Sequence, residues 1–381
     1  MRLPNREGAS AQKERQIMKK LIALTLAMVM ILSLCACDGK KDKNAKDDGE
    51  TVTAAKLTEV VMAEKSSDGE NHTMKATLEY DEDHNLIASK TYLDDKLSYS
   101  VTYDKDMEKP LVELEYDDEG KVNDRTENTY DANGNRVERN SSYTYDGETT
   151  TSKLVSTYDA KGNVLTEKAY RNGELEYDYT YTYTDSGKIA TESVKWSDGD
   201  SSTEAYTYDE HDNVLSITIT QCYGDEEEVR LTTYENTYEN GKLAEVKCYE
   251  DGALFRTEKY DADGNQILHV NYTDDSEYSR TESTYENGKL VKEVDYYDGK
   301  EESVSTYTYN ADGKLTEQTY TYGDEESQRR VYTYNDNGTL VGMKIYRGDE
   351  VRMEYSLTYE NITVSKEVAK KLEALVAALG M

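Results

Sequence analysis

Polar and aromatic positions alternate along most of this chain, and short polar turns interrupt the alternation at regular intervals. In residues 307–326, "YTYNADGKLTEQTYTYGDEE", Tyr307 and Tyr309 are two positions apart and therefore share one face of a strand. The "NADG" that follows favours a turn, because Asn and Asp tolerate tight geometry and Gly accepts a positive φ. A second strand, "KLTEQTYTY", comes next and ends at "GDEE". Each such unit predicts one β-hairpin.

The tyrosine before the turn recurs with a period of about 25 residues, which two strands and two turns account for. We therefore predict an all-β fold, an array of about twelve hairpin repeats over residues 57–364 that forms an extended or wound antiparallel sheet or solenoid. The recurring tyrosines are Tyr80, Tyr103, Tyr130, Tyr158, Tyr183, Tyr208, Tyr238, Tyr260, Tyr285, Tyr309, Tyr334 and Tyr359.

A second aromatic column closes the second strand of successive units, beside the other turn. Strict alternation would place Leu290, Val294 and Tyr296 on one face, but it would set Leu315 and Tyr322 on opposite faces. A β-bulge, or a sheet with aromatic residues on both faces, would reconcile the two patterns. The members of this column are Tyr170, Trp196, Tyr223, Tyr249, Tyr272, Tyr297, Tyr322 and Tyr346.

The last segment, residues 365–381, changes to a helical period. Ser365 is a suitable N-cap for the predicted helix. We expect this helix to cap the terminal edge strand of the array, and a helix that docks a partner or lies on a membrane surface is the alternative. Its apolar stripe consists of Val368, Leu372, Leu375, Val376 and Leu379.

The N-terminal region has the features of an export signal. In "MKKLIALTLAMVMILSLCAC", residues 18–37, two lysines precede an apolar run that is short for a membrane-spanning helix. Met18 is the natural start of this signal, which we place within residues 1–36.

The end of that signal resembles the lipobox of bacterial lipoproteins, with Leu34 and Ala36 preceding Cys37. The resemblance implies cleavage before Cys37 and a diacylglycerol on its thiol, and an ordinary cleaved signal or an uncleaved anchor is the alternative. Residues 37–56 then comprise the lipidated cysteine and a flexible tether. The expected location is the cell membrane, with the chain lipid-anchored and facing outside the cytoplasm.

The composition is acidic and rich in tyrosine, with 78 Asp+Glu against 45 Lys+Arg, a formal charge of −33 and 35 Tyr. Tyrosine supplies the apolar area that so few aliphatic residues could not, which favours an ordered β protein over a disordered chain. Nucleic acid is an unsuitable partner because no Lys/Arg patch is present. The charge is explained by solubility or by a cationic or metal-bearing partner.

The phrase Y-D-x-x-G-[NK]-[LVI] resembles the YD (RHS) repeat of bacterial surface proteins. It is carried by Tyr130 to Val137, Tyr158 to Val164 and Tyr260 to Ile267. In large members of that family the repeats wind into a β-shell around a toxin domain. This chain has about twelve units, and Asn or Lys where that family commonly has Arg, so it resembles a short lipoprotein that uses the repeat as a scaffold. It is also similar to choline- and glucan-binding hairpin repeats, without their tryptophans.

Few residues suggest chemistry. Cys222 and Cys248 occupy equivalent positions in adjacent repeats, and in a flat meander an intervening strand holds them about 9–10 Å apart, too far for a disulfide. We therefore favour two free thiols, and a disulfide would indicate a wound solenoid. "DADGN", Asp261–Asn265, resembles only the beginning of a calcium loop. No catalytic motif, metal site or cofactor site is predicted.

These observations predict a non-catalytic, membrane-anchored surface lipoprotein whose repeat scaffold binds a cell-wall or extracellular glycan, or a protein, through a tyrosine-rich sheet face. One alternative is a structural assembly partner that acts through a sheet edge or the C-terminal helix, and a hydrolase is a remote one. The candidate binding face consists of Tyr181, Tyr183, Tyr206, Tyr208, Tyr307, Tyr309, Tyr332 and Tyr334.

Overall fold

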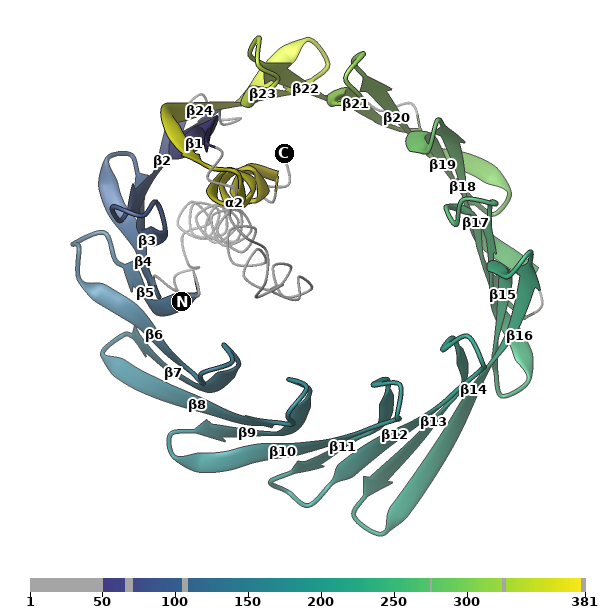
Figure 1. Ribbon diagram of the computed structural model, residues 1–381. Helices are drawn as coiled ribbons and strands as arrows, with labels where there is room; N and C mark the ends of the chain where they lie inside the picture. Colours follow the sequence, from purple (N-terminus) through teal and green to yellow (C-terminus); the bar gives the residue numbers. More distant parts are fainter. Residues whose placement is uncertain (1–50, 66–70, 105–108, 275, 324–326, 378–381) are drawn as a thin grey trace, which may run out of the picture. The chain divides into compact units, whose positions relative to one another are not determined.

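A computed structural model describes residues 51–65, 71–104, 109–274, 276–323 and 327–377, and these residues form an all-β fold with a short helix near the C-terminus (Figure 1). The predicted signal, Cys37 and the tether up to residue 50 lie outside the described residues. The chain divides into two compact units, and we describe each by itself. Unit 1 consists of Met1–Leu111, Tyr332–Met343 and Glu354–Met381, and unit 2 of Val112–Val331 and Lys344–Met353.

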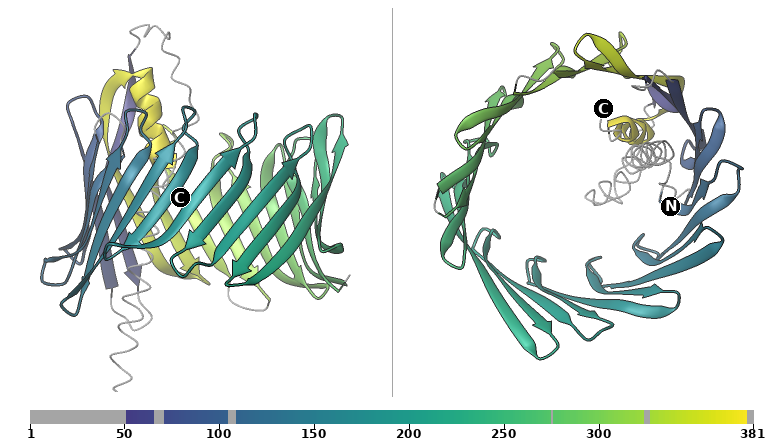
Figure 2. Two further views of the ribbon diagram at one scale, coloured as in Figure 1. Left: turned by 90° about the horizontal axis from the view of Figure 1, so that it is seen from below. Right: turned by 180° about the vertical axis from the view of Figure 1, so that it is seen from behind.

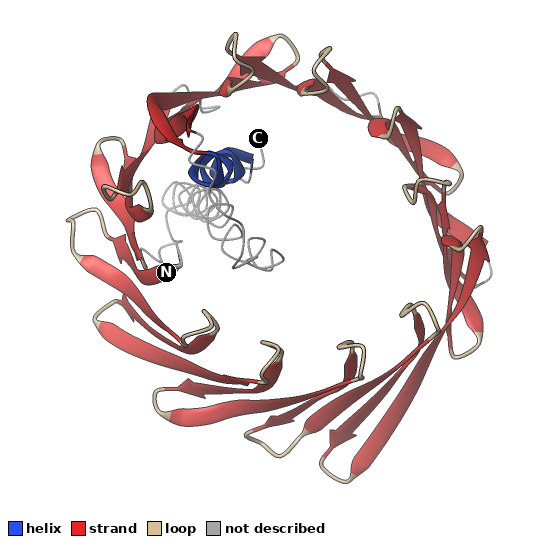
Figure 3. Ribbon diagram, viewed as in Figure 1, coloured by secondary structure: helices blue, strands red, loops and turns tan. Residues whose placement is uncertain are grey.

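Strands make up most of the described chain in both units (Figure 3). The elements that lie wholly or partly in unit 1 are β1 (Thr51–Lys65), β2 (Asn71–Tyr80), β3 (Leu86–Leu93), β4 (Lys96–Tyr103), β5 (Pro110–Tyr116), β22 (Gln328–Tyr334), β23 (Leu340–Arg347), β24 (Glu350–Ser365) and α2 (Lys366–Ala377). The remaining strands, all in unit 2, are β6 (Val122–Tyr130), β7 (Arg136–Tyr145), β8 (Glu148–Tyr158), β9 (Val164–Arg171), β10 (Glu174–Tyr183), β11 (Ile189–Trp196), β12 (Ser201–Tyr208), β13 (Val214–Tyr223), β14 (Glu226–Glu239), β15 (Lys242–Glu250), β16 (Ala253–Tyr260), β17 (Gln266–Thr273), β18 (Ser276–Glu286), β19 (Lys289–Tyr297), β20 (Lys300–Tyr309) and β21 (Leu315–Tyr322).

Each predicted repeat corresponds to antiparallel strands that follow one another along the chain. In unit 2, β10 pairs with β9 on one side and β11 on the other, and the same holds for the strands that follow (Figure 2). One part of the prediction is wrong. The array was expected to have open ends, but β1 pairs with β24 within unit 1, where the hydroxyl of Thr58 donates to Thr358 O at 3.1 Å. The edge of β1 and the edge of β24 that face each other are therefore paired and not open.

Two kinds of turn alternate, and the sequence determines which one forms. After Tyr130 the backbone N–H of Asp131 donates to Asn135 O at 2.9 Å, and that of Gly134 donates to Asp131 O at 3.0 Å. The other end of a hairpin uses two residues with positive φ, such as Asn172 (49°) and Gly173 (87°). Two such residues give a type I′ turn, whose twist matches that of the strands.

A β-bulge accompanies the tyrosine at the long turns and decides which face each residue takes. The register of β20 with β21 shifts between Thr308 and Tyr309, so that Tyr309 pairs with Leu315 while Ser303 pairs with Tyr322. Ser303 and Tyr309 share a face, so Leu315 and Tyr322 also share it. The bulge predicted as one way to reconcile these residues is therefore present.

The equivalent bulge between β18 and β19 contradicts the grouping of Leu290 with Val294 and Tyr296. Leu290 pairs with Tyr285, whereas Val294 pairs with Glu282, and the register shifts between Thr284 and Tyr285. Glu282 and Tyr285 point to opposite faces because they are three residues apart on one strand. Leu290 and Val294 therefore lie on opposite faces, and simple alternation fails because one residue is inserted between them.

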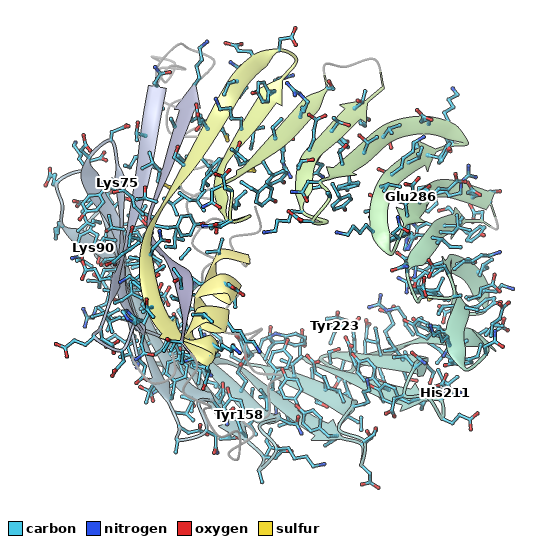
Figure 4. All side chains as sticks on the ribbon, turned by 45° about the horizontal axis from the view of Figure 1, so that its top comes forward. Lys75, Lys90, Tyr158, His211, Tyr223 and Glu286 are labelled. Carbon is cyan, nitrogen blue, oxygen red and sulfur yellow. The ribbon has the colours of Figure 1, made fainter. Side chains whose placement is uncertain are left out.

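The recurring tyrosines tie neighbouring hairpins together through their hydroxyl groups. The hydroxyl of Tyr183 donates to Val164 O at 2.7 Å, and Val164 begins the second strand of the preceding hairpin. Tyr158 makes the equivalent contact with Arg136 O at 2.8 Å (Figure 4). The same contact joins Tyr208 to Ile189 O, Tyr309 to Leu290 O, Tyr80 to Leu57 O and Tyr359 to Leu340 O, at 2.7, 2.9, 2.7 and 2.7 Å.

The C-terminal helix α2 begins where the sequence predicts, because the hydroxyl of Ser365 accepts the N–H of Val368 at 3.4 Å. It was expected to cap an edge strand, and that expectation is wrong. Instead α2 packs on the face of the sheet in unit 1, where Leu372 is 4% exposed and packs with Ala54 of β1 and Val364 of β24. The apolar stripe faces the sheet because the edge that it would have capped is already paired.

A smaller correction concerns the tether, which was predicted to extend to residue 56. Strand β1 begins at Thr51, and within it Ala54 is 8% exposed. Ala54 is buried because it packs against Val364 of β24 and Leu372 of α2. The repeat region therefore starts about six residues earlier than the sequence indicated.

Candidate functional site

The face of unit 2 that carries the recurring tyrosines also carries a row of rings and carboxylates. Along β10, Tyr177, Tyr179 and Tyr181 share one face, because they are two residues apart. The register places Glu167 opposite Tyr179 and Glu192 opposite Tyr181. We call this side of unit 2 the tyrosine face, defined by Glu167, Tyr177, Tyr179, Tyr181, Glu192, Glu204 and Tyr206.

The three tyrosines of β10 form a continuous aromatic row. The ring centroids of Tyr177 and Tyr179 are 5.3 Å apart at an interplanar angle of 84°, an edge-to-face contact. Those of Tyr179 and Tyr181 are 6.0 Å apart at 12°, a stacked contact. Both geometries are favourable for aromatic pairs, so the row is a preformed apolar strip.

Two carboxylates face each other beside this row. Glu192 of β11 is directly opposite Glu204 of β12, and like charges in that position repel each other. Burial, and then repulsion from Glu204, raises the pKa of Glu192 above its ordinary value. The hydroxyl of Tyr206 donates to Glu204 Oε2 at 2.5 Å, which leaves the pair only partly compensated.

The hydroxyls of the row respond to the same negative field. Burial, followed by the charges of Glu192 and Glu167, raises the pKa of Tyr181 well above its ordinary value. Burial and the hydrogen bond to Glu204 do the same to the pKa of Tyr206. These rings therefore stay neutral at every physiological pH, and the negative charge of the face belongs to its carboxylates.

The structure divides the eight predicted binding tyrosines by role. Tyr181 and Tyr206 belong to the row and its carboxylate pair. Tyr183 and Tyr208 lie on the same face, but their hydroxyls are bound to backbone carbonyls of the preceding hairpins. Tyr309 is bound in the same way to Leu290 O at 2.9 Å.

The remaining three predicted tyrosines lie outside the row of β10. Tyr307 is half-buried two positions before Tyr309 on β20. Tyr332 and Tyr334 belong to unit 1, where Tyr332 is 8% exposed. Six of the eight predicted tyrosines therefore belong to unit 2 and two to unit 1.

Sequence reasoning missed the acidic half of the face and one exposed pair of rings. Glu192 and Glu204 were not singled out, because simple alternation does not anticipate the bulge at Tyr183 that places Glu192 on the face of the tyrosines. Tyr143 and Tyr145, 45% and 65% exposed, stack with centroids 6.4 Å apart near a two-residue turn. The second aromatic column was the available signal for exposure, because Tyr223, Tyr297 and Tyr322 of that column are also exposed.

The other predicted positions have structural surroundings. Cys222 and Cys248 are free thiols on β13 and β15, with β14 between them as a meander requires. Burial raises the pKa of the Cys248 thiol, which therefore stays protonated.

Asp261 of the calcium-like segment accepts the N–H groups of Asp263 and Asn265, both at 2.9 Å, and so closes its own turn.

One loop departs from the repeat and joins two hairpins through side chains. Tyr238 donates its hydroxyl to Asp209 rather than to a backbone carbonyl, and Asn236 donates to the same carboxylate at 3.0 Å. His211, labelled in Figure 4, packs its ring 4.3 Å from that of Tyr238. Burial acts to raise the pKa of Asp209, but the hydrogen bonds from Tyr238, Asn213 and Asn236 outweigh it and lower the pKa to about 2.

Among the residues that the structure describes, no group of three or more His, Cys, Asp or Glu is arranged to hold a metal ion. Within those same residues, no helix has the length and apolar character needed to cross a bilayer. The chemistry of the tyrosine face suits the binding of a cation. Aromatic faces and carboxylates both attract cations, and the stacked rings offer apolar contact between them.

No family model matches the sequence, and no curated protein matches it. Among solved structures, the chain is similar to the crystal structure of TcdB2-TccC3-TEV, at 12% identity and a TM-score of 0.31, over 84% of this chain and 21% of that one. It is similar to the Photorhabdus luminescens Tc holotoxin pore at 12% identity and a TM-score of 0.29, over 78% of this chain and 22% of that one.

A porin-like protein from Bacteroides uniformis is similar at 14% identity and a TM-score of 0.23, over 80% of this chain and 98% of that one. The chain spans about a fifth of the length of the toxin chains that it matches. At these TM-scores the similarities carry no argument about function. The resemblance to YD repeats therefore rests on the residues quoted above for it.

Proposed function

We propose that this chain is a lipid-anchored, non-catalytic binding protein outside the cytoplasm, and that its tyrosine face binds a basic segment of a protein partner. The observation that carries the proposal is the carboxylate pair Glu192 and Glu204 beside the stacked rings of Tyr179 and Tyr181. A lysine or arginine side chain placed there would relieve the repulsion between the carboxylates and lie against an aromatic face.

The formal charge of −33 supports the same class of partner. A strongly acidic chain attracts basic proteins over a distance of about one Debye length and accelerates their association. A neutral glycan would gain nothing from that field. Of the two ligand classes expected for the tyrosine face, the carboxylates therefore favour the basic protein.

Two alternatives expected from the sequence lose support. Assembly through a terminal sheet edge would need an unpaired edge on β1 or β24. These two strands instead pair with each other. Docking through the C-terminal helix would need its apolar stripe to be accessible, yet Leu372 is 4% exposed against β1 and β24. The paired edge and the buried apolar stripe therefore favour the tyrosine face over these two alternatives.

The binding proposal is tested by titrating the full chain, in detergent, with a synthetic ten-residue oligolysine and measuring affinity by calorimetry. Changing both Glu192→Gln and Glu204→Gln should weaken binding about tenfold, because the repelling pair is the proposed contact. The matched control changes Glu210→Gln and Glu227→Gln, which removes the same charge from outside the tyrosine face. Equal losses in the two double variants would show a non-specific charge effect and refute the site.

The anchor is tested separately in a bacterial host. Labelling with an alkyne-tagged fatty acid should mark the wild-type chain, whereas Cys37→Ala should abolish the label. Cys222→Ala is the matched control and should keep it, because that cysteine lies in the repeat region. An unlabelled wild-type chain would remove the lipid from the proposal and leave the binding face untouched.

A further inference from the structure

The opposite side of unit 2 has a groove that the proposed function does not use. It has a volume of about 760 Å³ and crosses four strands, β6 to β9. The register places Arg125 opposite Ser142, Asn140 opposite Lys153, and Lys153 opposite Tyr170. Tyr130 lies on the tyrosine face, and Arg125 is five residues before it on the same strand, so Arg125 lies on the opposite face. The groove side chains paired with it by the register therefore also lie on the face opposite to the tyrosine face.

The charged groups of the groove are balanced. Arg125 Nε donates to Glu127 Oε1 at 3.0 Å. Lys153 Nζ lies 2.8 Å from Glu138 Oε2, and Asn140 Nδ2 donates to Glu138 Oε1 at 2.7 Å. Each cation is therefore compensated by a carboxylate, so these pairs give the groove no net charge that would attract a charged ligand.

The groove also has an apolar wall. Tyr170 is half-buried at the end of β9, and Val155 lies one strand away on β8. A neutral, polyhydroxylated ring needs this combination, because its C–H face packs on an aromatic ring and its hydroxyls both donate and accept hydrogen bonds. The volume lies within the range of about 300–1,000 Å³ that is typical of small-ligand sites.

We propose that this groove binds a neutral pyranose unit of a glycan. Tyr170 packs on the ring of the sugar, and Arg125, Glu127 and Asn140 form hydrogen bonds with its hydroxyls. The site is separate from the tyrosine face, so one chain would hold a basic protein on one side of the sheet and a sugar on the other.

The test is a calorimetric titration of the full chain, in detergent, with cellotetraose, maltotetraose and N-acetylchitotetraose, and with glucose as the single-ring probe. At least one of these neutral sugars should bind at millimolar concentration or below. Tyr170→Ala should weaken that binding about tenfold, whereas Tyr170→Phe, which keeps the ring, should stay within about threefold. Binding of glucose as tight as that of the tetrasaccharides supports the site and identifies a free sugar as its source.

The matched control is Tyr223→Ala, which removes an exposed tyrosine, 49% accessible, from the tyrosine face. It should leave sugar binding unchanged, and so should the Glu192 and Glu204 double variant, which separates this proposal from the binding of a basic partner. Circular dichroism confirms that each variant folds. The proposal is overturned if none of the four sugars binds at concentrations up to about 10 mM, or if Tyr170→Ala binds sugar like the wild type.

Discussion

The two units use the same hairpin repeat but cover the same side of it differently. In unit 1 the side that carries Tyr80 also carries Leu78, and α2 covers it through Leu375. In unit 2 the corresponding side carries Tyr179 and Glu192, and no helix of the described part of unit 2 packs on it. Of the 21 buried hydrophobic residues named for the described chain, 15 belong to unit 1 and six to the larger unit 2.

This difference shows that a repeat can be stable with or without a conventional core. Unit 1 buries aliphatic side chains under a helix, as most domains do. Unit 2 relies more on contacts that each repeat makes with its neighbour, namely the turn hydrogen bonds and the tyrosine hydroxyls. A face that is not needed as a core remains available for a ligand.

The largest effect should come from the helix-covered core. Leu57→Ala removes a side chain that is 1% exposed in unit 1, and it should lower the free energy of unfolding by about 2–5 kcal/mol. Leu215→Ala in unit 2, where the side chain is 38% exposed, should cost no more than about 1 kcal/mol. Urea denaturation followed by circular dichroism measures both, and equal losses would remove the distinction between the units.

The next effect concerns the long turns of unit 2. Gly264 has φ +91°, so Gly264→Ala should cost about 1–2 kcal/mol from backbone strain, even though nothing lies within 4 Å of an added Cβ. Gly264→Asn should cost less, because Asn tolerates this conformation and Asp212 occupies the equivalent position with φ 62°. If Ala and Asn gave the same thermal shift, strain would not be what fixes this position.

A smaller effect should report the tyrosine hydroxyls. Tyr183→Phe deletes the donor to Val164 O and should cost about 0.5–1.5 kcal/mol. The control, Tyr223→Phe, changes a ring that is about half exposed, 49%, and should be nearly neutral. Chemical denaturation of both variants decides whether the hydroxyls join the hairpins, and a neutral Tyr183→Phe would assign that role to the rings alone.

A further effect, confined to acid conditions, is a dependence of the free energy of unfolding on pH. The folded pKa of Asp209 is about 2, below the unfolded value of about 3.9, so its hydrogen bonds stabilise the fold above pH 4 and this contribution is lost as the pH falls towards 2. Asp209→Asn should flatten the stability profile in that window. Asn310→Asp, in an equivalent turn where Asn310 Oδ1 accepts the N–H of Lys314 at 2.9 Å, should steepen it. Denaturation between pH 2 and 6 measures both, and profiles parallel to that of the wild type would contradict the assignment.

Much of the fold follows from local chemistry in the sequence. A residue pair such as Asn172 and Gly173 tolerates positive φ at both positions, and Asp131 can bind the N–H groups of its own loop, so each turn forms wherever its residues occur. Turns at regular spacing then impose hairpins, and alternation places Tyr179 and Tyr181 on one face. The N-cap Ser365 and the apolar stripe after it determine a helix in the same local way.

Three features depend on strand register or on long-range packing, which the local patterns of the sequence do not specify. The pairing of β1 with β24 joins segments about 300 residues apart, and no local pattern specifies it. That pairing moves α2 from an edge to a face. The bulges at tyrosines such as Tyr183 shift the register by one residue, so Glu192 lies opposite Tyr181 and, together with its hairpin partner Glu204, takes the side of the sheet that carries the rings. The sequence by itself therefore determined turns, strands and the presence of an aromatic face, whereas the tertiary structure decided which termini pair, what covers each face and which charges lie beside the rings, because these depend on register and on long-range packing.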